Sequence, residues 1–297
     1  MLESFQTIQD ELKRLRAEGL KSVFVSDQTM KVLGEGSTAP NQDDIGVQDA
    51  RIDLVSDDSR AQTAVKNTQP KGFSIKPIPT EPASFHLPDG TASERLAWLD
   101  NHVENCPVCN EHLSREGKIV FGNGSETADI FFCGEAPGAD EERTGQPFVG
   151  KAGQLLTKII EAMGLTRDSV YIANILKWRP EHDKPYGNRP PTLEEMRFCL
   201  PYVKAQIEII KPKAIVALGN TAVQGLLGPD PKRRISKSRG TWDQFEKTPL
   251  MITFHPSYLL RNNTLETKRL VWEDMLKVME KVALPITEKQ RSYFLPK

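Results

Sequence analysis

Short apolar runs alternate with longer amphipathic segments through the last two thirds of the chain. The apolar runs are typical of strands in a parallel sheet that is covered on both faces. They occupy residues 129–133, 170–174, 214–218 and 250–254. The amphipathic segments predict helices over residues 151–163, 192–210, 221–227 and 267–282. Strand and helix in alternation predict an α/β fold of three layers, α/β/α, with a central four-stranded, mainly parallel sheet.

The first third of the chain has a different pattern. Leu2, Phe5 and later apolar residues recur at steps of three and four, which predicts a short amphipathic helix. Residues 31–86 are polar and show little periodicity, so we expect a largely disordered linker there. A further amphipathic helix is predicted over residues 93–103. These patterns divide the chain into an N-terminal extension (1–95), a folded domain (96–284) and a flexible C-terminal tail (285–297).

Composition places the chain among globular proteins. Hydrophobic residues make up 38% and charged residues 27% of its 297 positions. No apolar run approaches the roughly 18 residues that a membrane helix needs. The N-terminus lacks a basic stretch followed by an apolar one, so we expect a cytoplasmic protein that does not contact membranes. We also expect a monomer.

The net charge of −1 hides a basic segment. Residues 211–271 hold 11 Lys and Arg against 4 Asp and Glu. Such a concentration of positive charge suits a phosphate backbone, although a charged run is also found on ordinary solvated faces.

Chemically versatile residues follow each predicted strand. They are Gly134-Glu135-Ala136-Pro137-Gly138, Asn174, Gly219-Asn220-Thr221 and His255-Pro256-Ser257. In doubly wound folds the ligand binds beyond the carboxyl ends of the strands, so we expect these segments to form one site.

Three ordered motifs carry a resemblance to a known family. The first motif is the segment 134–138 followed by Gly-Gln-Pro-Phe-Val-Gly at 145–150. The second is Tyr-Ile-Ala-Asn at 171–174 followed by Lys-Trp-Arg-Pro at 177–180. The last comprises residues 255–261. They resemble the signatures of the uracil-DNA glycosylase superfamily, and family 4 of it most. The resemblance implies a DNA repair enzyme that flips uracil out of DNA and hydrolyses its N-glycosidic bond, leaving an abasic site.

The reaction makes a cation-like sugar and an anion-like base, and the resemblance names residues for both. His255 would donate a hydrogen bond to uracil O2 as negative charge develops there. A carboxylate near the sugar would orient the attacking water, and both Glu135 and Glu141 match the family in this region. The residues alone leave open which glutamate acts. The chemistry requires no cofactor.

Uracil recognition is implied for a second group. A side-chain amide at Asn174 would accept from uracil N3–H and donate to O4. Phe148 would stack on the flipped base. Ala136 and Gly138 are expected to contact the substrate, but in the best-studied branch an aspartate holds the position of Ala136, so that carboxylate is absent here. In the best-studied branch a tyrosine at the position of Gly138 excludes thymine, so the sequence does not explain how this chain excludes it.

Contacts with DNA and with one further partner are expected near the C-terminus. Arg239 belongs to a basic loop, and Ser257 with the segment Tyr258-Leu259-Leu260-Arg261 would meet the duplex where the base leaves it. Residues 290–295, Gln-Arg-Ser-Tyr-Phe-Leu, resemble peptides that bind the bacterial sliding clamp. The alternative is that this tail packs on the surface of its own domain.

Cysteine usage departs from the family pattern. Family 4 members hold a [4Fe-4S] cluster on four cysteines, and Cys106, Cys109 and Cys199 match three of these positions. The fourth position is Trp178, whose indole cannot ligate iron. The sequence leaves two alternatives: a labile cluster on an incomplete ligand set, or an aromatic plug that fills the same region.

Two other functions fit parts of the pattern. A non-catalytic protein that binds damaged bases or nucleic acid would need Asn174 and Phe148 but neither carboxylate. A nucleotide-binding α/β domain is less consistent with the sequence, because the Gly-x-Gly-x-x-Gly loop is missing and the segment 211–271 is basic.

Overall fold

The computed structural model describes residues 76–180 and 188–295. The predicted helix near the N-terminus and most of the predicted linker lie outside these residues. Residues 76–91 form no helix or strand, yet Phe85 stacks on Tyr202 with 5.4 Å between ring centroids. The part of the predicted linker that the structure describes is therefore packed on the domain.

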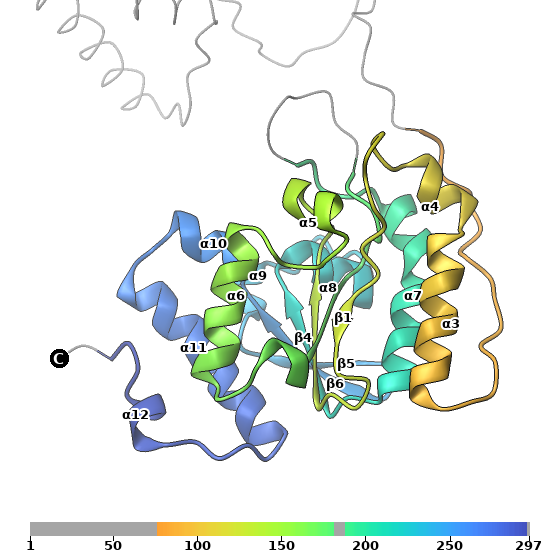
Figure 1. The fold of residues 1–297 in the computed structure, drawn as a ribbon. Helices are drawn as coiled ribbons and strands as arrows, with labels where there is room; N and C mark the ends of the chain where they lie inside the picture. Colours follow the sequence, from red (N-terminus) through yellow and green to blue (C-terminus); the bar gives the residue numbers. More distant parts are fainter. Residues whose placement is uncertain (1–75, 181–187, 296–297) are drawn as a thin grey trace, which may run out of the picture. The chain divides into compact units, whose positions relative to one another are not determined.

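The sheet has six strands in the order β1-β3-β2-β4-β6-β5 (Figure 1). They are β1 (Asn123–Gly124), β2 (Ile130–Gly134), β3 (Tyr171–Asn174), β4 (Ala214–Leu218), β5 (Trp242–Phe245) and β6 (Thr248–Thr253). The central four, β3-β2-β4-β6, are parallel, and β1 and β5 pair antiparallel at the edges. In register, Gly134 at the end of β2 lies opposite Asn174 at the end of β3.

The helices form a layer on each face of this sheet (Figure 1). One layer contains α3 (Ala92–Glu104), α7 (Leu193–Ile210) and α8 (Asn220–Leu227). The other contains α6 (Lys151–Ala162) and α11 (Leu265–Lys281). Successive strand residues alternate between the two cores: Phe131 and Cys133 face the first, and Ile130 and Phe132 face the second.

Shorter elements complete the domain. They are α4 (Pro107–Glu111), α5 (Ala139–Thr144), the 3-10 turn η1 (Arg167–Ser169), α9 (Ile235–Ser238), α10 (Pro256–Arg261) and α12 (Glu288–Arg291). None of the helices in the described ranges is long and apolar enough to cross a membrane.

The predicted α/β class and its four parallel strands are confirmed, and the structure adds two edge strands. The four central strands are almost wholly buried, which produces the apolar runs seen in the sequence. Strand β1 is two exposed residues, and three of the four residues of β5 are exposed. Edge strands of this kind carry no apolar run, so the sequence pattern does not reveal them.

The C-terminal segment packs on the domain's own surface, which is the alternative that the sequence left open. The Nε1–H of Trp272 in α11 donates to the carbonyl of Gln290 at 2.6 Å, and the ring of Tyr293 lies 5.2 Å from that of Trp272. The side-chain amide of Gln290 donates to the carbonyl of Ala162 at the end of α6. Residues 285–295 are therefore held by both α6 and α11.

Candidate active site

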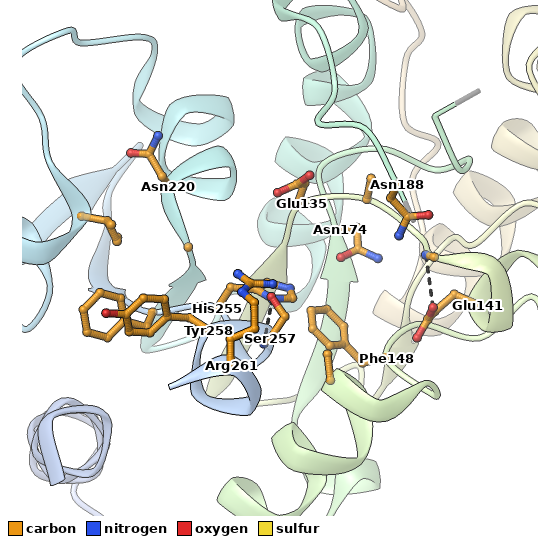
Figure 2. A pocket seen from close by; sticks show the side chains of 16 residues that line it. Glu135, Glu141, Phe148, Asn174, Asn188, Asn220, His255, Ser257, Tyr258 and Arg261 are labelled. Atoms are coloured by element: carbon orange, nitrogen blue, oxygen red, sulfur yellow. Dashed lines mark hydrogen bonds between the residues drawn. The ribbon is translucent and has the colours of Figure 1, made fainter. Parts of the chain in front are cut away.

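A cavity of about 510 Å³ opens at the carboxyl ends of β2, β3, β4 and β6 (Figure 2). Ten of the site residues predicted from the sequence line this cavity, although they come from segments far apart in the chain. These are Glu135, Ala136, Gly138, Glu141, Phe148, Asn174, His255, Ser257, Tyr258 and Arg261. The cavity confirms the geometric expectation that the strand-end motifs form one site.

Phe148 and Asn174 lie close together because Gly134 lies beside both. A Cβ atom at Gly134 would be 2.3 Å from Asn174 Oδ1 and 2.4 Å from Phe148 Cζ. Both distances are far below van der Waals contact, so any larger residue would displace the aromatic ring or the amide. Glycine at the end of β2 is therefore a requirement of the site rather than a signal for a turn.

Asn174 presents an unsatisfied acceptor to the cavity. Its side chain is 2% exposed, and Oδ1 has no hydrogen-bond partner among the described residues. Buried polar atoms are almost always paired with protein or water, so this acceptor is available to a donor that enters the cavity. Lys177 holds the backbone of Asn174, because its buried Nζ donates to the Asn174 carbonyl at 3.1 Å.

His255 caps the N-terminus of α10 with its ring. The Nδ1 atom accepts a hydrogen bond from the backbone N–H of Ser257 at 3.1 Å and lies 2.8 Å from the Ser257 hydroxyl. Burial, reinforced by the nearby charge of Arg261, lowers the pKa of His255 to about 4. The imidazole is therefore neutral at neutral pH, and its ring centroid is 5.7 Å from that of Phe148.

The two candidate glutamates differ in what they contact. Oε1 of Glu141 accepts from the backbone N–H groups of Val149 and Gly150, both at 2.9 Å, and Oε2 accepts from that of Gly138 at 3.1 Å. Its carboxylate is thus engaged in holding the loop (Figure 2). Burial raises the pKa of Glu135, against a hydrogen bond from the Thr221 side chain that lowers it.

The residues nominated for DNA contact separate into two groups. Ser257, Tyr258 and Arg261 line the cavity mouth on α10, and Tyr258 stacks on Phe254 with 4.4 Å between centroids. Leu259 is instead buried at 5% exposure, whereas Leu260 is 47% exposed. In a helix consecutive side chains point in different directions, so of the two leucines in the predicted segment only Leu260 faces solvent.

Arg239 is also placed differently from the expectation. It forms an ion pair and hydrogen bonds with the buried carboxylate of Asp274 in α11, and its Nη2 donates to the carbonyl of Leu270. Thr253 at the end of β6 donates to the same carboxylate at 2.6 Å. Through Asp274, Arg239 therefore links the basic loop to the strand that leads to His255, and its side chain is only 13% exposed.

The cavity is also lined by residues that the sequence did not identify as part of the base pocket. Asn188, Ile235 and Phe254 line it, and Asn220 from the predicted strand-end segment joins them. The Oδ1 atom of Asn188 accepts from Arg179 Nε at 2.8 Å, and its amide lies beside Gly138. The sequence before Asn188 is polar and has no periodic pattern, so nothing in it identifies Asn188 as a site residue. Phe254, in contrast, is the last residue of a predicted strand.

The three cysteines that match the family's cluster ligands are buried in contact with one another. The Cys106 thiol hydrogen-bonds to that of Cys109, and this bond together with burial raises the Cys106 pKa well above its usual range. Cys109 in turn hydrogen-bonds to Cys199. Within the part of the chain that the structure describes, no group of three or more His, Cys, Asp or Glu side chains is arranged to hold a metal ion.

Trp178 takes the fourth position and is fully buried. Its ring stacks on His112 at 5.1 Å and packs against Phe198 at 6.4 Å between centroids. An indole supplies no sulfur ligand, so this set of residues does not fit a cluster held by four thiolates. The packing matches the aromatic plug that the sequence allowed as an alternative.

Comparisons with known proteins agree with this architecture. The uracil DNA glycosylase superfamily matches residues 121–276, so the chain belongs to that superfamily. Type-4 uracil-DNA glycosylase from Thermotoga maritima is 43% identical over 188 residues, which is 63% of this chain and 94% of that protein. The type-4 enzyme from Sulfurisphaera tokodaii is 37% identical over 211 residues, covering 68% of this chain and 91% of the relative. The resemblance inferred from the motifs is confirmed.

Proposed function

We propose that this protein removes uracil from DNA by hydrolysing the N-glycosidic bond after the nucleotide has left the base stack. The observation that carries the proposal is the buried, unpartnered Oδ1 of Asn174 beside the ring of Phe148, as far as the described residues go. A pyrimidine that stacks on Phe148 and donates from N3 would satisfy that acceptor, and uracil has this donor where cytosine has an acceptor. The relatives named type-4 uracil-DNA glycosylase support the same substrate.

His255 would stabilise the leaving base. Because Nδ1 accepts from Ser257 N–H, the proton of the neutral ring belongs on Nε2, which is then a hydrogen-bond donor for uracil O2. A neutral donor strengthens its bond as charge develops on the oxygen, and interactions of this kind contribute about 3 kcal/mol to a transition state.

Glu135 is the stronger candidate for the carboxylate that acts near the sugar. Both glutamates line the cavity, but the two oxygens of Glu141 accept from three backbone N–H groups. Glu135, directly after β2, accepts a hydrogen bond from the Thr221 side chain and none of these backbone bonds. A carboxylate there would orient the attacking water and stabilise positive charge on the sugar.

The DNA would be bound along α10 and the neighbouring basic segment. Ser257 and Arg261 would contact phosphates at the cavity mouth, and the exposed Leu260 would fill the space that the flipped base leaves. Of the two leucines in the predicted segment 258–261, the apolar wedge is then Leu260 and not the buried Leu259.

Docking of residues 290–295 on a sliding clamp stays a separate proposal, supported by the exposure of Phe294 and Leu295. Gln290 and Tyr293 are engaged with α6 and α11, so docking would require the segment to leave its own domain. A peptide of residues 287–297 should then bind the clamp more tightly than the full chain does. Absence of saturable peptide binding would overturn this proposal.

The experiment that tests the main proposal uses a labelled oligonucleotide with one deoxyuridine, treated with the full chain and then with alkali. Cleavage at the uracil position shows a glycosylase. Gel retention without cleavage would instead show a non-catalytic binder of damaged bases. The variant Glu135→Gln should still bind the oligonucleotide but excise uracil more than about tenfold more slowly. Arg143→Ala is a matched control, because Arg143 is exposed on α5 outside the cavity.

A further inference from the structure

Phe148 has a backbone conformation that is unusual for its residue type. Its φ angle is 54°, in the left-handed region that bulky side chains rarely occupy. Such a conformation persists only where the surroundings determine it, and it is often found at ligand sites. The surroundings of Phe148 therefore indicate which residues aim its ring into the cavity.

Arg167 binds the backbone carbonyls of Phe148 and of the residue before it, Pro147. It lies in η1 and does not line the cavity. Its Nη2 donates to the carbonyl of Pro147 at 2.6 Å, and its Nη1 donates to the carbonyl of Phe148 at 3.0 Å. Nη1 also donates to the hydroxyl of Thr157 in α6, which fixes the guanidinium on that helix.

Glu141 holds the peptide groups that follow. Its carboxylate accepts from the N–H groups of Val149 and Gly150. The peptide group between Phe148 and Val149 is therefore bound at its carbonyl by Arg167 and at its N–H by Glu141. The loop is also pressed on Gly153 of α6, where a Cβ atom would lie 1.9 Å from the Phe148 carbonyl carbon. Figure 2 shows the Phe148 ring in the cavity and Glu141 beside it.

We propose that Arg167 is a positioning residue that fixes the Phe148 ring for base stacking without touching the substrate. The inference rests on the proposed function of Phe148. A forked guanidinium binds two successive carbonyls at once, which a single ammonium cannot do in the same geometry. Without that fork the Phe148 backbone is free to relax toward negative φ, and the ring then leaves the face that the base would contact.

A double-mutant cycle tests the proposal under single-turnover conditions. Arg167→Met should slow uracil excision about tenfold when Phe148 is present, as expected when a stacking group is misplaced. In the Phe148→Ala background the same change should have less than about a twofold effect, because Arg167 acts through the ring. Arg167→Lys should give an intermediate loss. Arg143→Met, on an exposed face, should change neither background.

Equal losses in the two backgrounds would overturn the proposal. If Arg167→Met fails to fold, Arg167→Lys is taken through the same cycle with the same criterion.

A second readout is independent of activity and so separates failure of this inference from failure of the proposed function. Hydrogen exchange at the Val149 and Gly150 amides should accelerate in Arg167→Met, while exchange of the β4 amides should stay unchanged. Unchanged exchange at Val149 and Gly150 would contradict the positioning role even in a protein that excises no uracil.

Discussion

The ring nitrogen Nδ1 of His255 accepts a hydrogen bond from the backbone N–H of Ser257 at 3.1 Å. This bond requires an unprotonated Nδ1, so the ring proton is directed to Nε2. Because burial lowers the pKa of His255 to about 4, the ring carries no charge at neutral pH. His255 is therefore built as a neutral hydrogen-bond donor and not as an imidazolium.

The depressed pKa of His255 predicts how stability depends on pH. Between its ordinary value of 6.5 and the folded value of about 4, the unfolded chain binds a proton here that the folded chain does not. Stability at this site therefore falls as pH decreases through that window and is constant below it. Urea unfolding from pH 7.5 to 4.5 should show a smaller loss for His255→Gln than for the wild type. Parallel curves for the two proteins would contradict the buried, neutral state.

Replacing Asn174 by aspartate should alter base selection. The substitution Asn174→Asp removes the donor to uracil O4 and supplies an acceptor, which suits the amino group of cytosine. Uracil excision should fall while the ratio of uracil to cytosine excision decreases. The check is single-turnover excision from two oligonucleotides that differ only in that base. A drop in rate at a constant ratio would reduce Asn174 to a structural role.

Arg239 and Arg261 should respond in opposite ways to the same substitution. Arg239→Gln leaves the carboxylate of Asp274 buried without its ion-pair partner and should cost about 3 kcal/mol of unfolding free energy. Arg261→Gln, at the cavity mouth, should stay within about 0.5 kcal/mol in stability. It should weaken DNA binding and reduce the salt dependence by about one charge. Urea unfolding and DNA titration at several salt concentrations measure both effects, and the reverse pattern would show that Arg239 contacts DNA.

The cysteine cluster gives a prediction about iron. Protein purified without oxygen should contain clearly fewer than four irons per chain, because Trp178 leaves a set of only three sulfur ligands at the family's positions. Trp178→Cys should raise the iron content by supplying a fourth thiolate in the space that the indole fills. A wild-type protein with four stable irons would show that another group ligates the fourth position.

Much of the fold was predictable because burial leaves a direct trace in the sequence. Strand β4 matches its predicted bounds, and it is buried at every position. Strand β1 left no trace, since two exposed residues, Asn123 and Gly124, produce no apolar run. The packed C-terminal segment was also undecided from sequence, because Tyr293 is apolar in part and suits either a partner or its own domain.

Site residues could be predicted where they stand at the end of a buried strand. They were harder to predict where the direction of a side chain decides whether it reaches the site. Asn174 and His255 come at or directly after the ends of buried strands and line the cavity as expected. The choice between Leu259 and Leu260 depends on the rotation of α10, which one short helix does not reveal in its pattern. Arg167 acts on Phe148 over a separation of 19 residues, and only the folded loop brings them together.

If the cavity binds uracil and the protein breaks the bond from uracil to the sugar, free base must appear in the reaction. The most direct measurement is the release of free uracil, in a single turnover, from an oligonucleotide with one deoxyuridine. We expect about one uracil per oligonucleotide for the wild type and an intact strand until alkali is added. The release rate should be more than about tenfold lower for folded His255→Ala. Absence of free uracil from the wild-type reaction, or an unchanged rate in His255→Ala, would contradict these expectations.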